Sequence, residues 1–273
     1  FYVGPGPREA EKAQRINVDG TRNVLELIEE LDVPKGVYTS TVGVYPGTSE
    51  ATLDESIDPE CPTYAEYFRT KWEAHFEVAK PMMDDGLPLV IVQPGGVYGP
   101  HDKLYGSGRA AFRDYLTGDL PMIPRKWSLP MDHAEDIAQA HLQAMAEGVP
   151  GEEYIVASEP RTMPEVLGCA EEITGIPAPR TVPDGVFGAL ATVMRGVERI
   201  VTPPEGLESE LLEFFAGRQF NVDSSKAKRE LGLEFRSLED GLKDYLAWEM
   251  DQLGIEPART DRASQGSSAD TAP

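Results

Sequence analysis

Tyr67 and Lys71 are the residues of this chain whose types and spacing most directly suggest chemistry. They stand four positions apart in the stretch YFRTK, inside a segment (63–83) whose pattern predicts a long helix. Residues four apart lie on one face of a helix, so the ammonium would lie beside the phenol. A neighbouring ammonium favours the phenolate and lowers the tyrosine pKa from about 10, and such a tyrosine can act as a general acid or base. The same spacing also fits a solvated helix face, so the pair alone leaves both interpretations open.

Two further segments place polar or flexible groups at the ends of predicted strands. YTSTVGVY carries the hydroxyls of Thr39, Ser40 and Thr41 at one strand end. QPGGVYGPHD follows the next buried strand, and its glycines would let the backbone approach a flat ligand. The carboxyl ends of parallel strands face the crevice in which ligands bind. Strand propensity and an ordinary turn are the simpler explanations of the two stretches.

Strand and helix signals alternate in the first half of the chain, and the resulting elements must position these residues. Helical periodicity marks 17–31, with Val24, Leu25, Ile28 and Leu31 on one face. Short β-branched or apolar runs mark 35–42 and 87–96 as buried strands, and 46–62 is expected to be a loop. Further helices are predicted at 108–118, 132–148, 163–175, 224–232 and 237–254, with a strand at 152–158. This order predicts an α/β fold with a parallel sheet covered by helices.

The composition restricts the partners that the protein can have. The formal net charge is −22, from 47 acidic and 25 basic side chains. A surface this acidic repels phosphate backbones and anionic lipids. We therefore expect no nucleic-acid and no membrane partner. The acidic residues are spread along the whole chain, which suggests a halophilic, salt-adapted source. Cys61 and Cys169 lack the spacing of a disulfide framework or metal site, and no signal peptide is visible, so we expect a cytoplasmic protein.

Two other motifs invite a ligand and are better explained otherwise. The opening stretch FYVGPGPREAE has Gly4 and Gly6, but the third glycine position of a dinucleotide-binding turn holds Glu9, which would repel pyrophosphate. We expect a loop that leads into the following helix. A second cluster is acidic and histidine-rich and contains Asp132, His133, Glu135, Asp136 and His141. Helix capping and packing explain this cluster more simply than metal binding, and we predict no metal.

Taken in order, these motifs resemble the extended short-chain dehydrogenase/reductase family, that is, the NAD-dependent epimerase/dehydratase group. NVDGTRNVLE is similar to the family's Asn-Val-x-Gly-Thr helix start, and MDHAEDIAQAHLQA to its later Val-His-x-x-Asp-x-Ala helix. GEEYIVAS and SSKAKRELGLEFRSLEDGLKDYL are similar to its C-terminal lobe. The resemblance covers roughly residues 1–254, and the most similar members are dihydroflavonol-reductase-like and hopanoid-associated sugar-epimerase-like.

The resemblance implies a Rossmann-type doubly wound parallel sheet with a smaller C-terminal substrate lobe. It also implies NAD or NADP as cofactor and hydride transfer on a carbinol or ketone of a small molecule, such as a sugar nucleotide or a small alcohol. Tyr67 matches the catalytic tyrosine, Lys71 the lysine that binds the nicotinamide ribose, and Thr41 the hydroxyl that bonds the substrate oxygen. The positions that match the family's cofactor-binding residues are Asn17, Tyr67, Lys71, Pro94, Gly95, Gly96 and Val97.

The matched segments also predict how the chain is organised. Residues 1–99 and about 127–150 form a partial nucleotide-binding domain, about 100–126 and 151–254 a substrate lobe, and 255–273 a disordered tail. The family's first strand, Gly-rich turn and second strand have no counterpart, so we expect a fragment that lacks roughly 60–80 preceding residues. A homodimer through helices on one side of the sheet is expected from the family. The alternative is a non-catalytic binding or regulatory protein that kept the fold and lost the dinucleotide loop.

Overall fold

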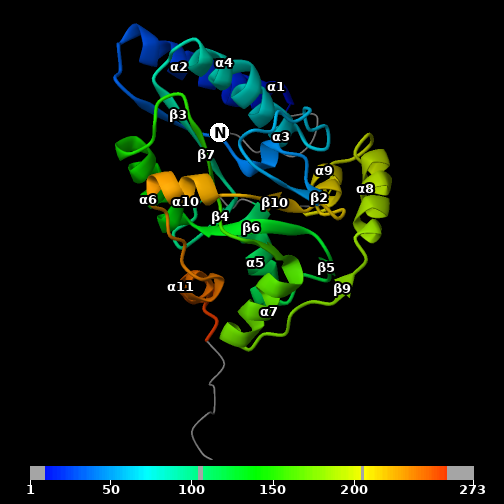
Figure 1. The fold of residues 1–273 in the computed structure, drawn as a ribbon. Coiled ribbons are helices and arrows are strands. Elements are labelled where there is room, and N and C mark those ends of the chain that lie inside the picture. The colour runs from blue at the N-terminus through cyan, green and yellow to red at the C-terminus, as the bar shows by residue number, and fades with distance from the viewer. Residues whose placement is uncertain (1–9, 104–106, 204–205, 257–273) are drawn as a thin grey trace, which may run out of the picture.

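The computed structural model of the protein describes residues 10–103, 107–203 and 206–256. The strands run through the middle of the molecule, with α1 to α4 gathered at one end and α5, α7 and α11 at the other (Figure 1). The loop expected at residues 1–9 and most of the tail expected at 255–273 lie outside the described residues. Within the described part, none of the helices combines the length and apolar character that a bilayer crossing requires.

A parallel three-stranded sheet in the order β1–β3–β7 forms the centre of the molecule. Its strands are β1 Gly36–Thr39, β3 Leu89–Pro94 and β7 Glu153–Val156. Gly36 lies opposite Leu89, and Pro94 lies opposite Val156. Every residue of β3 is buried, and this burial on both faces explains its unbroken apolar run. The strands expected at 35–42, 87–96 and 152–158 are thereby confirmed.

Helices cover both faces of this sheet. Successive side chains of β3 point to opposite faces and so belong to two different cores. Leu89 and Ile91 belong to the core under the first helical layer, whereas Val90 and Val92 belong to the core under the second. The first layer comprises α1 Ala10–Ala13, η2 Gln14–Asp19, α2 Gly20–Glu30, α3 Glu66–Trp72, η4 Glu73–Ala79 and α4 Lys80–Asp84. The second comprises α6 Ala134–Ala146 and α10 Ser225–Leu231.

The long helix predicted for 63–83 forms, with a π-helical turn, η4, between α3 and α4. Pro81 lies in the first turn of α4 and has no N–H to bond the carbonyl of Glu77 four residues earlier. A local π-helical turn accommodates such an irregularity without ending the helix. Lys71 and His75 therefore both still face β1, as their bonds to Thr39 and Ser40 demonstrate.

The helix predicted at 17–31 also forms, but its apolar face is not the predicted one. Leu25 is buried, whereas Val24 is 57% and Leu31 70% exposed. The buried line runs through Val18 and Leu25, with Ile28 packed against the same core. The helix contacts its neighbours along one narrow side only, so the apolar residues beside that line remain in solvent.

The second half of the chain builds the remaining strands and a helical lobe. Short strands form three small sheets, β4–β6–β8, β2–β10 and β5–β9. These are β2 Thr48–Leu53, β4 Gly96–Tyr98, β5 Ile123–Pro124, β6 Ser128–His133, β8 Pro160–Thr162, β9 Thr181–Val182 and β10 Phe220–Val222. The helices of the lobe are α5 Ser107–Thr117, α7 Met163–Thr174, α8 Gly185–Val197, α9 Ser209–Phe214 and α11 Leu238–Leu253. Tyr98, Tyr115 and Tyr245 lie in the core shared by α5, α7 and α11.

One expectation about the secondary structure is wrong. The segment 46–62, expected as a loop, contains β2, which pairs with β10 about 170 residues later in the chain. This difference comes from long-range strand pairing, which local sequence patterns do not encode. In the range 151–254, expected as part of the substrate lobe, β7 pairs with β3 of the central sheet. The division into domains stays a prediction.

Candidate active site

The carboxyl end of β1 meets α3 and the end of β3, and the predicted catalytic residues lie there. Ser40 extends the sheet by donating its N–H to Val92 O at 2.7 Å. Thr41 then caps the short 3₁₀-helix η3 (Val42–Val44), and its Oγ1 accepts from the N–H of Gly43 at 3.1 Å. Among the described residues the Thr41 hydroxyl donates to no other group, so its proton is available for a ligand oxygen.

Lys71 projects from α3 onto the end of β1 and is almost completely buried, at 6% exposure. Its Nζ donates to Thr39 O at 2.8 Å and to the Tyr38 hydroxyl at 3.4 Å. Nζ also lies 5.0 Å from the centroid of the Tyr38 ring. Burial lowers the pKa of Lys71 to about 8, because removal from water disfavours the charged ammonium.

Tyr67 lies one turn before Lys71 and is half-buried. Its ring packs edge-on against Phe68, with 5.0 Å between the centroids. Burial raises the pKa of Tyr67, and the neighbouring Tyr38 raises it further. The predicted lowering of this pKa is therefore wrong for the protein without cofactor, because desolvation of the phenolate dominates and the Lys71 ammonium is directed at β1.

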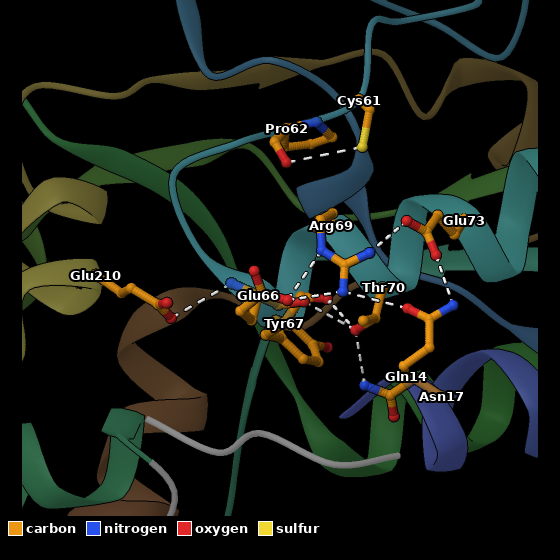
Figure 2. A network of polar contacts seen from close by, with 10 residues as sticks. All are labelled: Gln14, Asn17, Cys61, Pro62, Glu66, Tyr67, Arg69, Thr70, Glu73 and Glu210. Atoms are coloured by element: carbon orange, nitrogen blue, oxygen red, sulfur yellow. Dashed lines mark hydrogen bonds and ion pairs between the residues drawn. The ribbon is translucent and has the colours of Figure 1, made fainter. Parts of the chain in front are cut away.

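Asn17 connects η2 to α3 rather than standing open to a ligand. It is buried, and its Nδ2 donates to Thr70 Oγ1 at 3.0 Å (Figure 2). The Thr70 hydroxyl in turn donates to a carbonyl of the preceding turn, to Glu66 O at 2.9 Å or to Tyr67 O at 3.0 Å. Asn17 thus supports the helix one residue before Lys71, and its predicted contact with the cofactor stays a prediction.

Ion pairs along its surface fix α3 further. Arg69 donates to Glu66 at 2.7 and 2.9 Å, pairs with Glu73, and donates to Gln14 Oε1 at 3.2 Å (Figure 2). Gln14 also donates to Glu73 Oε2 at 2.8 Å. At the start of the helix, the Glu66 N–H donates to Glu210 Oε2 of α9 at 3.3 Å. These contacts resist rotation of α3, which keeps Lys71 directed at the sheet.

The segment Pro94–Val97 passes from β3 into β4 at the same edge of the sheet. The Gly95 N–H donates to Asp132 Oδ2 at 3.0 Å. A Cβ at Gly95 would lie 2.7 Å from Pro130 O, and one at Gly96 2.6 Å from Leu129 Cδ2. Close packing on β6 therefore accounts for both glycines, whereas the sequence suggested room for a flat ligand. Val97 is 50% exposed.

A chain of buried polar groups lies beneath the candidate site. His75 Nδ1 lies 2.7 Å from Ser40 Oγ, and His75 Nε2 lies 2.9 Å from Glu153 Oε2. Glu153 also accepts from Gln93 at 2.8 Å and from Lys80 at 2.6 Å. Burial alone would raise the pKa of Glu153, but the hydrogen bonds and charges of His75 and Lys80 outweigh it and lower the pKa. One sequence feature pointed to these groups, namely that His75 follows Lys71 by one helical turn.

The histidine and acidic residues of 132–141 have structural contacts. The His133 side chain caps α6 by accepting from the Glu135 N–H at 3.3 Å. His141 Nδ1 bonds Ile137 O at 2.7 Å, and its Nε2 lies 2.8 Å from Thr39 Oγ1. Asp136 binds Arg236 at 2.9 Å. In the described ranges, no group of three or more such side chains is arranged to hold a metal ion.

Comparisons with known proteins identify the family and the fold of the chain. Residues 5–157 match the model of the NAD dependent epimerase/dehydratase family. "Sterol demethylase protein B" of Methylococcus capsulatus is 28% identical over 248 residues, which cover 85% of this chain and 71% of that protein. The Synechocystis protein named "Putative dihydroflavonol 4-reductase" is 29% identical over 251 residues, which cover 88% and 71%.

A solved structure extends the likeness to the fold. The crystal structure of gox2253 superposes with a TM-score of 0.76 at 26% identity, over 94% of this chain and 78% of that one. The parallel sheet with helices on both faces is the Rossmann-type α/β arrangement predicted from the motifs. With its family model matched over more than half of its length, the chain belongs to the NAD dependent epimerase/dehydratase family.

Proposed function

We propose that this enzyme moves a hydride between a secondary carbinol or its ketone and NAD or NADP, with Thr41, Tyr67 and Lys71 as catalytic residues. The observation that supports this most is the buried Lys71 ammonium, held by Thr39 O on the face of α3 that also carries Tyr67. An isolated buried cation is unfavourable. A non-catalytic binding protein would have no need to retain it, and this favours the enzyme over that alternative.

The residues present fit a nicotinamide cofactor. The ammonium of Lys71 has three donors, and in the described part of the chain it uses two, on Thr39 and Tyr38. The third is available for a hydroxyl of the nicotinamide ribose. The Pro94–Val97 segment lies at the same strand edge, with Val97 presenting an apolar exposed side chain. The cofactor, when bound, supplies the hydride acceptor or donor.

Tyr67 and Thr41 would handle the substrate oxygen. In the oxidising direction the carbinol proton passes to Tyr67 while the hydride leaves the carbinol carbon, and a ketone results. In the reverse direction Tyr67 returns that proton to the ketone oxygen. The Thr41 hydroxyl donates a hydrogen bond to the same oxygen and orients it. Tyr67 must be a phenolate to accept the carbinol proton, but burial alone raises its pKa. We therefore expect the Lys71 charge to favour the phenolate in the complex with bound cofactor.

Our proposal for the substrate class rests on the aromatic side chains next to Tyr67 and on the names of two relatives. Phe68 lies 5.1 Å from Tyr64 and 5.1 Å from Phe214, and Phe214 lies 5.4 Å from Trp127, measured between ring centroids. Such rings favour apolar, planar ligands. The names of two relatives, a sterol demethylase protein and a dihydroflavonol 4-reductase, refer to fused-ring compounds. We therefore favour a fused-ring carbinol as substrate.

The proposal is tested by calorimetric titration of NAD and NADP, followed by turnover of a 3β-hydroxysteroid and of UDP-glucose. We expect micromolar binding of one cofactor, oxidation of the steroid, and loss of turnover in Tyr67→Phe by about 100-fold or more. Tyr115→Phe is the matched control, because it removes the hydroxyl of a buried tyrosine that bonds Thr174 in the lobe. Unchanged turnover in Tyr67→Phe would overturn the catalytic assignment, and turnover of UDP-glucose alone would overturn the substrate class.

A further inference from the structure

Asp132 is a buried carboxylate directly behind the Pro94–Val97 segment. It lies in β6, opposite Val97 of β4, and is 1% exposed. One oxygen, Oδ2, accepts from the Gly95 N–H at 3.0 Å. The other, Oδ1, accepts from the Ser158 N–H at 2.7 Å. Asp132 therefore bridges the turn after β3 and the loop after β7, two neighbouring strands of the central sheet.

The fit around this carboxylate is tight. A Cβ at Gly95 would lie 2.6 Å from Asp132 Oδ2, so only glycine lets the backbone approach. Pro94 itself pairs with Val156, so the two bonded amides follow paired strand ends. A shift of the carboxylate would therefore move the turn that begins at Gly95.

Only the ionised form of Asp132 matches this arrangement. A carboxylate accepts through both oxygens, whereas a protonated acid turns one of them into a donor. Burial raises the pKa of Asp132 to about 6, although the hydrogen bonds from Ser158 and Gly95 lower it. Asp136 of α6 raises it further, and Tyr98 of β4 is the other titratable group beside it, with a pKa that burial and then Asp132 raise. In the described part of the chain no cation binds the Asp132 carboxylate.

We propose that Asp132 is a positioning residue, which in its ionised form holds Gly95 and thereby the segment facing the nicotinamide, and which releases that segment on protonation. The consequence for cofactor affinity rests on the proposed function. The hydrogen bond from the Gly95 N–H to Asp132 does not depend on the proposed function, because it can be observed in the protein without cofactor.

The test combines hydrogen exchange at the Gly95 amide with calorimetric titration of NAD. We expect the protection of Gly95, corrected for the intrinsic rate, to fall at least tenfold from about pH 7.5 to about pH 5, as for loss of one hydrogen bond to a charged group. The amides of Leu89–Val92 in β3 serve as the internal reference. The dissociation constant for NAD should rise by about the same factor over that range.

Asp132→Asn should remove the pH response, since its amide group would place a donor against one of the two N–H groups. We expect low Gly95 protection and weak NAD binding at both pH values in this variant. Asp136→Asn is the matched control, because Asp136 binds Arg236 and neither amide, and it should keep the response.

Protection that does not change with pH in the wild type, or wild-type protection in Asp132→Asn, would overturn the proposal. The wild-type comparison stands even if Asp132→Asn fails to fold. A pH response at Gly95 without any NAD binding at neutral pH would support the positioning role of Asp132. It would count against the proposed function instead.

Discussion

At the scale of single residues, Lys71 is the central group of the candidate site, and its burial should measurably lower the stability of the folded protein. The pKa of Lys71 is lowered from 10.5 to about 8 by burial. With this lowered pKa, Lys71 binds fewer protons in the folded protein than in the unfolded chain. The free energy of unfolding is therefore reduced below the folded-state pKa and recovers as the pH rises toward the unfolded-state pKa. The difference corresponds to an upper bound of about 3 kcal/mol. Evolutionary retention of such a cost is expected at functional sites.

Replacing Lys71 by methionine should therefore separate stability from activity. We expect Lys71→Met to raise the free energy of unfolding at pH 7 by about 1 kcal/mol, once the lost bond to Thr39 O is deducted, while turnover is abolished. Between pH 8 and 10.5 the wild-type stability should rise relative to that of the variant. Urea denaturation across this range measures both, and a less stable variant at pH 7 would contradict the account.

The spacing of Tyr67 and Lys71 was sufficient to predict that they share a helix face. It was not sufficient to predict the pKa of Tyr67, because that depends first on burial and then on the neighbouring Tyr38. Asp132 shows the same limit. Its acidic neighbours in the sequence suggested capping or metal binding, whereas its contacts come from Gly95 and Ser158.

At the scale of elements, the Glu153 carboxylate joins α3–α4, β3 and β7. It accepts from His75, Gln93 and Lys80, and His75 in turn bonds Ser40, which precedes Thr41. A carboxylate can only accept, so His75 donates to Glu153 through Nε2, and its Nδ1 lies 2.7 Å from the Ser40 hydroxyl oxygen. The strand ends next to Thr41 and Pro94 are thus tied to the helix that carries Lys71.

Glu153→Gln should loosen these elements together. We expect a loss of about 3 kcal/mol in the free energy of unfolding at pH 7, because buried donors lose a charged acceptor, and a lower turnover number. Since the pKa of Glu153 is lowered, the stabilisation is present above the unfolded pKa and disappears as pH falls through the folded one. Denaturation at pH 7 and pH 4 measures it. Glu135→Gln, at a side chain 70% exposed, is the control, and equal losses in both variants would contradict the role of Glu153.

The contact between η3 and α3 permits a test with glycine substitutions. A Cβ at Gly43 would lie 2.2 Å from the Phe68 ring, whereas one at Gly168 in α7 would meet nothing within 4 Å. Gly43→Ala should therefore destabilise by about 1–3 kcal/mol and reduce turnover by displacing α3. Gly168→Ala should stabilise by about 0.5–1 kcal/mol. Thermal melts and turnover measure both, and a tolerated Gly43→Ala would show that α3 can shift without consequence.

Most elements could be predicted from periodicity and strand composition, including β1, β3 and the helix that carries Lys71. The pairing of β2 with β10 could not, because its partners are remote in sequence. The orientation of α2 was not predicted correctly, because the helix has more apolar residues than its neighbours can cover. Val24 and Leu31 remain exposed for this reason.

At the scale of the whole molecule, the net charge of −22 should affect stability through charge repulsion. Like charges at the surface repel one another, and salt screens this repulsion over a Debye length of about 10 Å at 0.1 M. We expect the melting temperature to rise as KCl is increased from about 0.05 to 1 M. Full stability at the lower concentration, with no further gain, would count against the salt-adapted source that we propose.

The family and the Rossmann-type fold could be predicted because the motifs occur in the order that the sheet requires. The division into a nucleotide-binding part and a substrate lobe stays a prediction, as do the expected preceding segment and the dimer. The choice between NAD and NADP could not be made from the segments that resemble the family, because none of them matches the family's ribose-reading residue.

Deuterium transfer is the measurement that tests the central claim most directly. A 3β-hydroxysteroid deuterated at the carbinol carbon is incubated with the enzyme and NAD or NADP, and the reduced cofactor is examined by mass spectrometry. We predict one deuterium at nicotinamide C4 for each ketone formed, at a rate reduced by about 100-fold or more in Tyr67→Phe. Ketone formed without deuterium in the cofactor, or an undiminished rate in Tyr67→Phe, would contradict hydride transfer assisted by Tyr67.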